Sequence, residues 1–318
     1  MFRENNRPGD WYDPGRRSGQ ENGSKAARGT PVLLWIALAV FFVTAVIGFL
    51  ILRPKPGEGR EKPYGGAKVK KQTVWENEYV SVTAEGIINA SGDYYYCDAL
   101  GLTVKNKSDQ EIRLSCASLA VNGAALQPVL SAEAGPGETV KAELVMDNYN
   151  MDDMKVKTPD SFTMELFVTD RSGTVLTRSP ILTVSTTKKG KGDTPEYKYP
   201  GKALYDEDGV SVGSEGFRPA GTTMRYGVCF HLDNSSGRTV RFTAQEIVLN
   251  DLPFDTEAEA FFQDGTRGVC YAWTDFRELE EIDKKRPLFP ITRVSGTCAV
   301  YDAESGEKLT EFPFKYEK

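Results

Sequence analysis

The chain has 318 residues, of which 39 are Lys or Arg, 45 are Asp or Glu and one is His. A single histidine excludes His-rich metal centres, two-histidine zinc motifs and relays of several histidines. The charge is divided unevenly, because residues 1–71 carry a net charge of +7 and residues 72–318 a net charge of −13. The acidic region argues against nucleic acid as a partner.

Residues 1–30 are rich in Asn, Gly, Arg, Ser and Pro and show no apolar periodicity. This composition predicts a disordered tail on the cytoplasmic side. Trp11 and Tyr12 are its only aromatic side chains after Phe2. A short docking motif and an incidental turn are both compatible with them, and the Gly-Asp before and Asp-Pro-Gly after them favour the turn.

The next 22 residues, Pro31 to Leu52, contain no charged side chain. As a helix with a rise of about 1.5 Å per residue they extend roughly 33 Å, enough to cross a hydrocarbon core of about 30 Å. A buried core helix rarely runs this far without a charged position, and a cleaved signal peptide has a shorter apolar stretch. We therefore predict a single transmembrane helix at residues 31–52, with the lipid bilayer as its partner.

The orientation of this helix is not decided by its flanks, which carry six Lys and Arg in residues 1–30 and seven in residues 53–71. Because positive residues favour the cytoplasmic side, the one additional positive residue after the helix slightly disfavours an extracellular C-terminus. Long domains, however, translocate largely regardless of charge. An acidic, β-rich region is typical of a surface ectodomain. We expect a single-pass protein of the cell membrane with its N-terminus inside and its C-terminal domains extracellular.

Residues 53–72 form a Pro-, Gly- and Lys-rich stalk, which we expect to be semi-extended and cationic. Its charge suits anionic lipid headgroups or an anionic wall polymer. A solvated spacer explains the same composition equally well, and the two readings stay open.

The remainder of the chain contains one domain twice. Residues 105–122 align with residues 233–250 at an offset of 128 without a gap, so that Asn106 matches Asn234 and Asn122 matches Asn250. At the start of each copy, Tyr79-Val-Ser-Val-Thr-Ala-Glu-Gly matches Gly209-Val-Ser-Val-Gly-Ser-Glu-Gly at an offset of 130. We place copy 1 at residues 73–186, a Lys-, Gly- and Pro-rich linker at 187–203, and copy 2 at 204–318.

The residue pattern of each copy predicts β-structure. Polar and apolar residues alternate in runs such as 140–146 and 162–168, and clusters of turn residues separate the runs. We predict a mainly β fold of two tandem immunoglobulin-like antiparallel β-sandwiches with six or seven strands each. One helix is expected at Asp275–Lys285, with Thr274 as its N-cap and its end before Pro287, and a short counterpart at Asp147–Met154.

The sequence from the span onward resembles membrane-anchored, immunoglobulin-like surface proteins of Gram-positive bacteria. The resemblance rests on Tyr79-Val-Ser-Val-Thr-Ala-Glu-Gly, Val104-Lys-Asn-Lys-Ser and Ser118-Leu-Ala-Val-Asn-Gly. It covers residues 31–318 at the level of architecture and implies a non-enzymatic module at the cell surface. It assigns no functional residue.

Gly209-Val-Ser-Val-Gly213 is a literal Gly-x-Ser-x-Gly sequence. A nucleophile elbow needs a strand, a sharp turn and a helix around its serine. The matching segment of copy 1, Tyr79–Thr83, is a plain alternating strand without either glycine. We therefore expect Ser211 to lie in a strand.

His231 and Cys229 are two residues apart on one predicted strand and point away from its apolar face. Such a pair suits metal binding or thiol activation. Copy 1 has Gly101 and Thr103 at these positions, so the fold does not require the pair. We expect an incidental pair on the surface.

The chain has five cysteines, an odd number, and none matches a cysteine of the other copy. No shared disulfide therefore follows from the duplication. Packing as small hydrophobic residues is expected for Cys116, Cys270 and Cys298. Bridges between Cys97 and Cys116 or between Cys229 and Cys270 stay open as minor alternatives.

Other polar segments point to solvated or incidental roles. The acidic stretches 206–209 and 147–153 lack the spacing of a calcium loop and favour solvated turns. Three glycosylation sequons begin at Asn89, Asn106 and Asn234, and they matter only in a eukaryotic secretory host. Tyr94-Tyr95-Tyr96 reads as the start of a strand rather than as an adhesive patch.

We assign no catalytic, cofactor-binding or metal-binding residue, and no cofactor. The leading hypothesis is a non-catalytic surface protein that presents its two domains for binding or scaffolding, with a protein or an envelope polymer as partner. The alternative is a transmembrane sensor of an envelope ligand that signals through its N-terminal tail.

Overall fold

The computed structural model describes residues 66–91, 97–146, 148–198, 201–219, 225–286 and 288–318. They all belong to one compact unit, Arg60–Lys318. The predicted tail 1–30, the predicted span 31–52, Tyr94–Tyr96 and most of the predicted stalk lie outside the described residues. Within those ranges, no helix is long and apolar enough to cross a membrane.

The fold is mainly β, with sheets that are almost entirely antiparallel. In the N-terminal half, residues 66–198, one sheet has the order β1-β2-β3-β7. Its strands are β1 (Gln72–Glu76), β2 (Val80–Asn89), β3 (Asp98–Asn106) and β7 (Thr139–Met146). The second sheet of this half has the order β10-β8-β4-β5, and β6 and β9 add to β4 and β8. Its strands are β4 (Ile112–Val121), β5 (Ala124–Leu126), β6 (Ser131–Ala134), β8 (Ser161–Asp170), β9 (Val175–Arg178) and β10 (Leu182–Ser185).

The C-terminal half, residues 201–318, repeats this plan. One set of strands has the order β11-β12-β13-β17, and a second sheet has the order β15-β14-β18-β19 with β16 beside β14. The first set is β11 (Lys202–Glu207), β12 (Val210–Pro219), β13 (Arg225–Asn234) and β17 (Thr266–Asp275). The second is β14 (Val240–Leu249), β15 (Leu252–Pro253), β16 (Ala258–Phe262), β18 (Arg293–Asp302) and β19 (Lys308–Glu317). A helix precedes the late strand in both halves, α2 (Asn148–Asp153) before β8 and α3 (Phe276–Lys285) before β18.

The helices lie where we expected them, but the predicted N-cap was wrong. Helix α3 begins at Phe276, directly after β17, so Thr274 still belongs to the strand. The Thr274 hydroxyl is buried and has no hydrogen-bond partner. Each half also has more strands than predicted, because short segments such as β5 and β15 contain too few residues to show an alternation.

The motif shared at an offset of 130 forms a β-bulge in both halves. The register between β2 and β3 shifts between Ala84 and Gly86, and that between β12 and β13 shifts between Ser214 and Gly216. One extra residue therefore stands outside the ladder in each half, Glu85 or Glu215. Gly216 has a φ of 73°, and a Cβ there would lie 2.3 Å from the Tyr316 ring, so only glycine fits.

The matched residues Asn106 and Asn234 anchor the turns that follow β3 and β13. Both are buried, at 0% and 2% exposure. Each Oδ1 accepts hydrogen bonds from the backbone amide and hydroxyl of the serine two residues later. Each Nδ2 donates to backbone carbonyl oxygens at 2.7–3.0 Å: those of Gln110, Ala134 and Gly135 in the first half, and of Arg238 and Phe262 in the second. Because these amides are buried and engaged, both sequons are inaccessible to a glycosylating enzyme in the folded chain.

Asn122 and Asn250, the second matched pair, end β4 and β14 in the left-handed region, with φ of 54° and 47°. The Asn122 Oδ1 accepts from the backbone amides of Asp160 and Ser161 at the start of β8. The Asn250 Oδ1 accepts from the amides of Thr292 and Arg293 at the start of β18. The repeated asparagines thus fix the same strand crossing in both halves.

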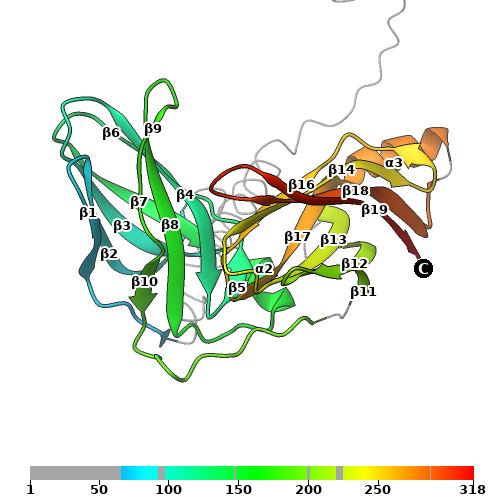
Figure 1. Cartoon of the computed structure of the whole chain (residues 1–318), viewed down its shortest axis with the longest axis horizontal. Coiled ribbons are helices and arrows are strands. Elements are labelled where there is room, and N and C mark those ends of the chain that lie inside the picture. Colours follow the sequence, from blue (N-terminus) through cyan, green and yellow to red (C-terminus); the bar gives the residue numbers. More distant parts are fainter. Residues whose placement is uncertain (1–65, 92–96, 147, 199–200, 220–224, 287) are drawn as a thin grey trace, which may run out of the picture. The chain divides into compact units, whose positions relative to one another are not determined.

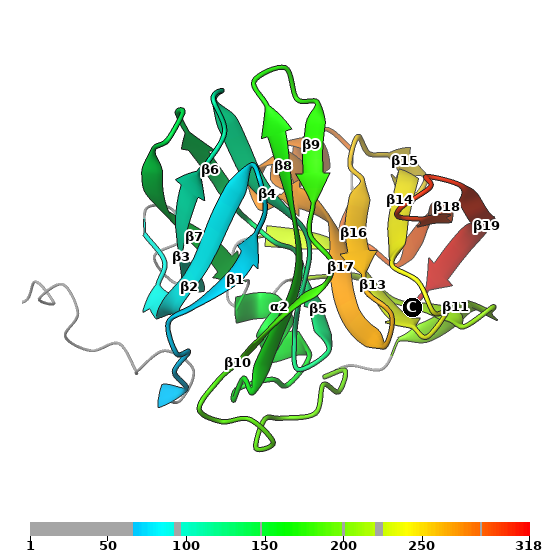
Figure 2. The ribbon, with the colours of Figure 1, turned by 60° about the vertical axis from the view of Figure 1, so that its left-hand side comes forward.

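The two halves share one sheet and part of one core. Strand β5 pairs in parallel with β17, Ala124 opposite Arg267 and Ala125 opposite Gly268, which joins ten strands into a continuous sheet. In both views, β5 and α2 lie where the two groups of strands meet (Figure 1 and Figure 2). The core of the N-terminal half also takes in Cys229, Val269 and Tyr271 of the C-terminal half.

We expect Gly268→Ala to lower the free energy of unfolding by about 1–3 kcal/mol, the usual cost of overpacking. A Cβ at this position would lie 2.6 Å from the Ala125 carbonyl oxygen, so the seam between β5 and β17 must open. Urea denaturation of a fragment of residues 60–318 measures the change. Gly135→Ala is the control, because its Cβ would meet only the flexible end of Glu138 at 3.3 Å. Equal stability of the two variants would contradict the close approach at the seam.

Candidate functional site

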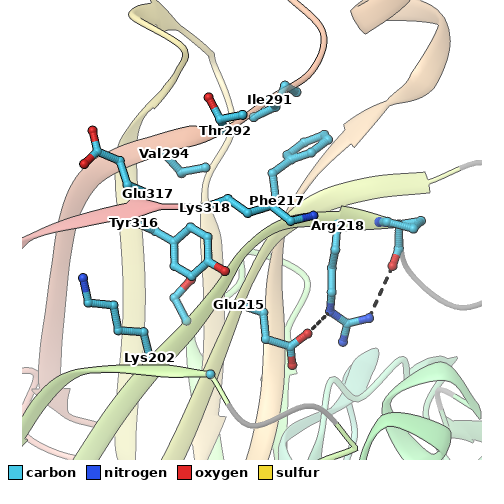
Figure 3. Close-up of a pocket in the computed structure, with 13 residues that line it drawn as sticks. Lys202, Glu215, Phe217, Arg218, Ile291, Thr292, Val294, Tyr316, Glu317 and Lys318 are labelled. Carbon is cyan, nitrogen blue, oxygen red and sulfur yellow. Dashed lines mark hydrogen bonds and ion pairs between the residues drawn. The ribbon is translucent and has the colours of Figure 1, made fainter.

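A recess of about 610 Å³ opens in the C-terminal half, beside β12 and the ends of β18 and β19. Glu215, Phe217 and Arg218 of β12 line one side, and Tyr316 and Lys318 line the other (Figure 3). Lys202 of β11 also borders it. The recess combines aromatic surface with groups of both charges, and its volume lies in the range of ligand-binding pockets.

A polar cluster lies behind the recess, where the halves meet. We call it the junction cluster: Asp153, Glu215, Arg218, Cys229, His231 and Tyr271. Arg218 is its centre, with its Nε 2.5 Å from the Glu215 Oε2 and its Nη2 2.9 Å from the Asp153 Oδ2. These side chains are at most 15% exposed. Glu215 and Arg218 therefore belong both to the recess and to the junction (Figure 3).

The remaining contacts connect the cluster across the junction. The Arg218 Nη2 donates to the Tyr271 hydroxyl, which donates to the Asp153 Oδ2. The other Glu215 oxygen, Oε1, contacts the His231 Nε2. Because Asp153 belongs to α2 and its partners belong to β12 and β17, this network ties the two halves together.

The predicted linker covers this face of the C-terminal half. The Tyr197 ring stacks on the His231 ring, with centroids 4.4 Å apart. Its hydroxyl donates to the Leu232 carbonyl oxygen at 2.7 Å. The linker therefore reaches the junction at Tyr197.

Burial sets the protonation chemistry of the cluster. It raises the pKa of the Cys229 thiol to about 12, although the Arg218 guanidinium acts in the opposite direction. Burial likewise raises the pKa of Tyr271 well above its usual value. Burial disfavours the charged form of Arg218, but Cys229, Tyr271, Asp153 and Glu215 outweigh it and raise its pKa. Cys229 is therefore a protonated thiol near neutral pH, which does not suit a nucleophile.

The prediction that Cys229 and His231 form a surface pair was wrong. Both point away from the core of their own half, as the alternation indicates, but they are 0% and 5% exposed. The N-terminal half and the linker cover that face. The prediction of a solvated turn at 147–153 was also wrong, since Asn150 and Asp153 contact the C-terminal half and are 2% and 4% exposed.

Ser211 lies within β12, paired with Asp206 and Asp233 of the neighbouring strands. The strand continues for eight residues beyond it, with no turn or helix at the serine, so the segment is not a nucleophile elbow. The acidic stretch 206–209 crosses from β11 to β12, with Asp208 and Gly209 at φ of 52° and 75°, as in a tight hairpin turn.

None of the five cysteines forms a disulfide bond. Cys229 lies opposite Tyr271, and Cys270 lies opposite Phe230, so their side chains stand on opposite faces of the sheet. This geometry rules out the Cys229–Cys270 bridge that the sequence left open. Cys97 packs with Ala90, Ala99 and Val145, and the Cys116 thiol donates to the Ser118 carbonyl oxygen, so they do not bridge either.

We expect the native thiols to resist alkylation by iodoacetamide at pH 8. Four of the five cysteines are buried, and burial raises the pKa of Cys116 to about 12 and those of Cys270 and Cys298 well above the usual value. Mass spectrometry of the native chain should show little modification over the time in which the urea-unfolded chain gains five labels. Rapid labelling of native Cys229 would contradict its burial.

Sequence reasoning missed Arg218, Tyr271 and Tyr197. The available signal was a difference between the copies at outward-facing positions, since Arg218 stands where copy 1 has Ile88. Cys229 and His231 likewise replace Gly101 and Thr103. These three differences mark the face of the sheet on which the polar site lies.

No family model matches the chain, and no curated protein matches it. Among solved structures it is similar to a protein of unknown function from Porphyromonas gingivalis W83, at 10% identity over 70% of this chain and 91% of that one, with a TM-score of 0.19. It is also similar to the Salmonella enterica SafA pilin in complex with the SafB chaperone, at 8% identity over 69% and 89% of the chains and a TM-score of 0.19. The Amycolatopsis orientalis exo-chitosanase CsxA matches at 12% identity over 68% of this chain and 25% of its own, with a TM-score of 0.18. Such low identities and TM-scores assign neither a fold family nor a function.

Proposed function

We propose that the chain is a single-pass membrane protein that presents two duplicated immunoglobulin-like antiparallel β-sandwiches at the cell envelope as one binding unit. Residues 31–52 anchor it, the stalk separates it from the bilayer, and the recess of the second sandwich takes a ligand. A protein or an envelope polymer is the partner, and no catalysis is involved.

The proposal rests on the recess, because ion pairs of the junction cluster hold two of the side chains that line it. A binding site needs groups whose positions are fixed before the ligand arrives, because ordering them on binding costs affinity. Glu215 and Arg218 meet this requirement, since the junction cluster holds them from behind. The exposed side chains Lys202 and Lys318 are left at the rim to contact a partner.

Protease treatment of intact cells tests the location. We expect added protease to degrade residues 66–318 while a cytoplasmic control protein survives. Full protection of this region, with digestion only after lysis, would overturn the surface assignment.

Co-sedimentation with the isolated cell envelope tests the recess. We expect the full chain, purified in detergent, to sediment with the envelope, and Lys202→Glu together with Tyr316→Ala to reduce the bound fraction at least tenfold. Lys308→Glu is the matched control, because Lys308 is exposed, carries the same charge and lies outside the recess. Equal binding by both variants would overturn the recess as the binding site.

One observation favours the sensor as a second candidate. Because Arg218 lines the recess and also pairs with Asp153 of the N-terminal half, a ligand that moves Arg218 changes the junction. Deletion of residues 1–30 discriminates between the two candidates. If the chain is a sensor, the deletion abolishes signalling while envelope binding persists. If the chain is a scaffold, the deletion leaves the phenotype of the cells unchanged.

A further inference from the structure

Within the junction cluster, the Glu215 carboxylate, the Cys229 thiol and the His231 imidazole present an oxygen, a sulfur and a nitrogen toward one point. The three ligand atoms lie within 4.8 Å of one another. Tetrahedral zinc with bonds of about 2.0–2.3 Å places its ligands roughly 3.3–3.8 Å apart. The observed limit of 4.8 Å exceeds these separations by about 1 Å, a difference on the scale of a side-chain rotation. Strands β12 and β13 supply all three and are held in register on both sides of the bulge.

The duplication shows that this donor set is not part of the fold. In the N-terminal half the same bulge presents Glu85, which accepts a hydrogen bond from the Thr103 hydroxyl at 2.7 Å and pairs with Lys71 at 2.9 Å. Glycine occupies the position of the cysteine there, at Gly101. In the N-terminal half, the carboxylate at the bulge is thus bound by a hydroxyl and a surface lysine. Of the two halves, the C-terminal one has sulfur and nitrogen donors at this place.

The summed charge of the cluster favours a bound cation. Asp153 and Glu215 as carboxylates and Arg218 as guanidinium sum to one net negative charge in a buried site. A divalent ion bound with Cys229 as thiolate adds one net positive charge and brings the sum to zero. Buried charge is stable only when it is balanced in this way.

Arg218 contacts two of the three donor groups and orients them, rather than competing with the ion for their electron pairs. Its Nε holds the Glu215 Oε2, which leaves Oε1 on the side of His231. Its Nη2 donates to the Cys229 sulfur at 3.6 Å. Metal-binding carboxylates are commonly oriented by such a second hydrogen bond. Tyr197, stacked on the imidazole, fixes the ring of the third donor.

We infer that Glu215, Cys229 and His231 form a zinc site buried at the junction of the two halves, with a water molecule as the fourth ligand. On binding, the Cys229 thiol releases its proton to solvent and its sulfur bonds to the ion. His231 binds through Nε2 as the tautomer protonated at Nδ1, which replaces its contact with Glu215. The ion and its water enter from the recess, which Glu215 and Arg218 line. Bound zinc locks β12 and β13 beneath the linker and so stabilises the junction.

Metal analysis of the full chain, purified in detergent, tests the site. After treatment with a chelator and dialysis against zinc and then zinc-free buffer, we expect about one zinc per chain by mass spectrometry, the occupancy of a three-residue site with one water. Cobalt in place of zinc should give a thiolate-to-metal charge-transfer band in the near ultraviolet. Zinc should also raise the melting temperature of the chain.

Cys229→Ser and His231→Asn should each lose the zinc and the charge-transfer band. Cys270→Ser should keep both, because it removes the adjacent thiol on the opposite face of the sheet. Circular dichroism at the dialysis temperature confirms that each variant is folded. A zinc-free native chain would overturn the inference. Zinc retained by folded Cys229→Ser, or cobalt bound without the charge-transfer band, would place the ion elsewhere and overturn it as well.

Discussion

Replacement of Arg218 by leucine is expected to lower the free energy of unfolding by about 3–5 kcal/mol, the usual cost of removing one partner from a buried ion pair. The substitution leaves the carboxylates of Asp153 and Glu215 buried, at 5% and 10% side-chain exposure, without their shared cation. It also removes the donor to the Tyr271 hydroxyl. Urea denaturation of residues 60–318, followed by tryptophan fluorescence, measures the loss.

Two further variants separate the lost ion pair from lost packing. Arg218→Leu combined with Asp153→Asn and Glu215→Gln should recover part of the stability, because no unpaired charge then remains. Arg241→Leu is the control, since its pair with Glu259 is exposed and is expected to contribute at most about 1 kcal/mol. If Arg218→Leu costs no more than this control, the junction cluster does not hold the halves together.

Asn234→Ala is expected to cost about 2–4 kcal/mol, because each buried polar group left without a partner costs about 1–3 kcal/mol. The substitution removes the donor to the carbonyl oxygens of Arg238 and Phe262 and the acceptor for Ser236. Asn106→Ala removes the equivalent bonds in the N-terminal half and should cost a similar amount. Thermal and urea unfolding of the same fragment measure both.

Asn89→Ala is the matched control, because the Asn89 amide is exposed and donates only to the Asp98 carboxylate. A change within about 0.5 kcal/mol is expected for it. A similarly small effect of Asn234→Ala would show that the buried amide is not an anchor. A large loss for one copy and none for the other would show that the two halves do not use their matched asparagines alike.

Much of the fold could be predicted because it is encoded in local patterns. Alternation marks β8 at Ser161–Asp170, and the shared asparagines mark equivalent turns. The helix before Pro287 follows from its composition and ends at Lys285. These features depend on residues close in sequence, where propensity and hydrogen-bonding capacity act directly.

The candidate site could not be predicted in the same way. Alternation correctly places Cys229 and His231 on the outer face of β13, but it does not say what lies against that face. Asp153 is 65 residues from Arg218, and Tyr197 is 34 residues from His231. These contacts join separate elements of the chain, and the pairing of β5 with β17 is a further contact of this kind between the two halves.

The sequence by itself determined the duplication, the mainly β character, the two helices and the apolar stretch at residues 31–52. Only the tertiary structure decided that the copies share a sheet and that a charged cluster is buried between them. The physical reason is the cost of burial. A carboxylate or thiol on the outer face of one copy is an ordinary solvated group until another surface displaces the water. Once that surface is in place, the same group must be paired, protonated or bound to a metal.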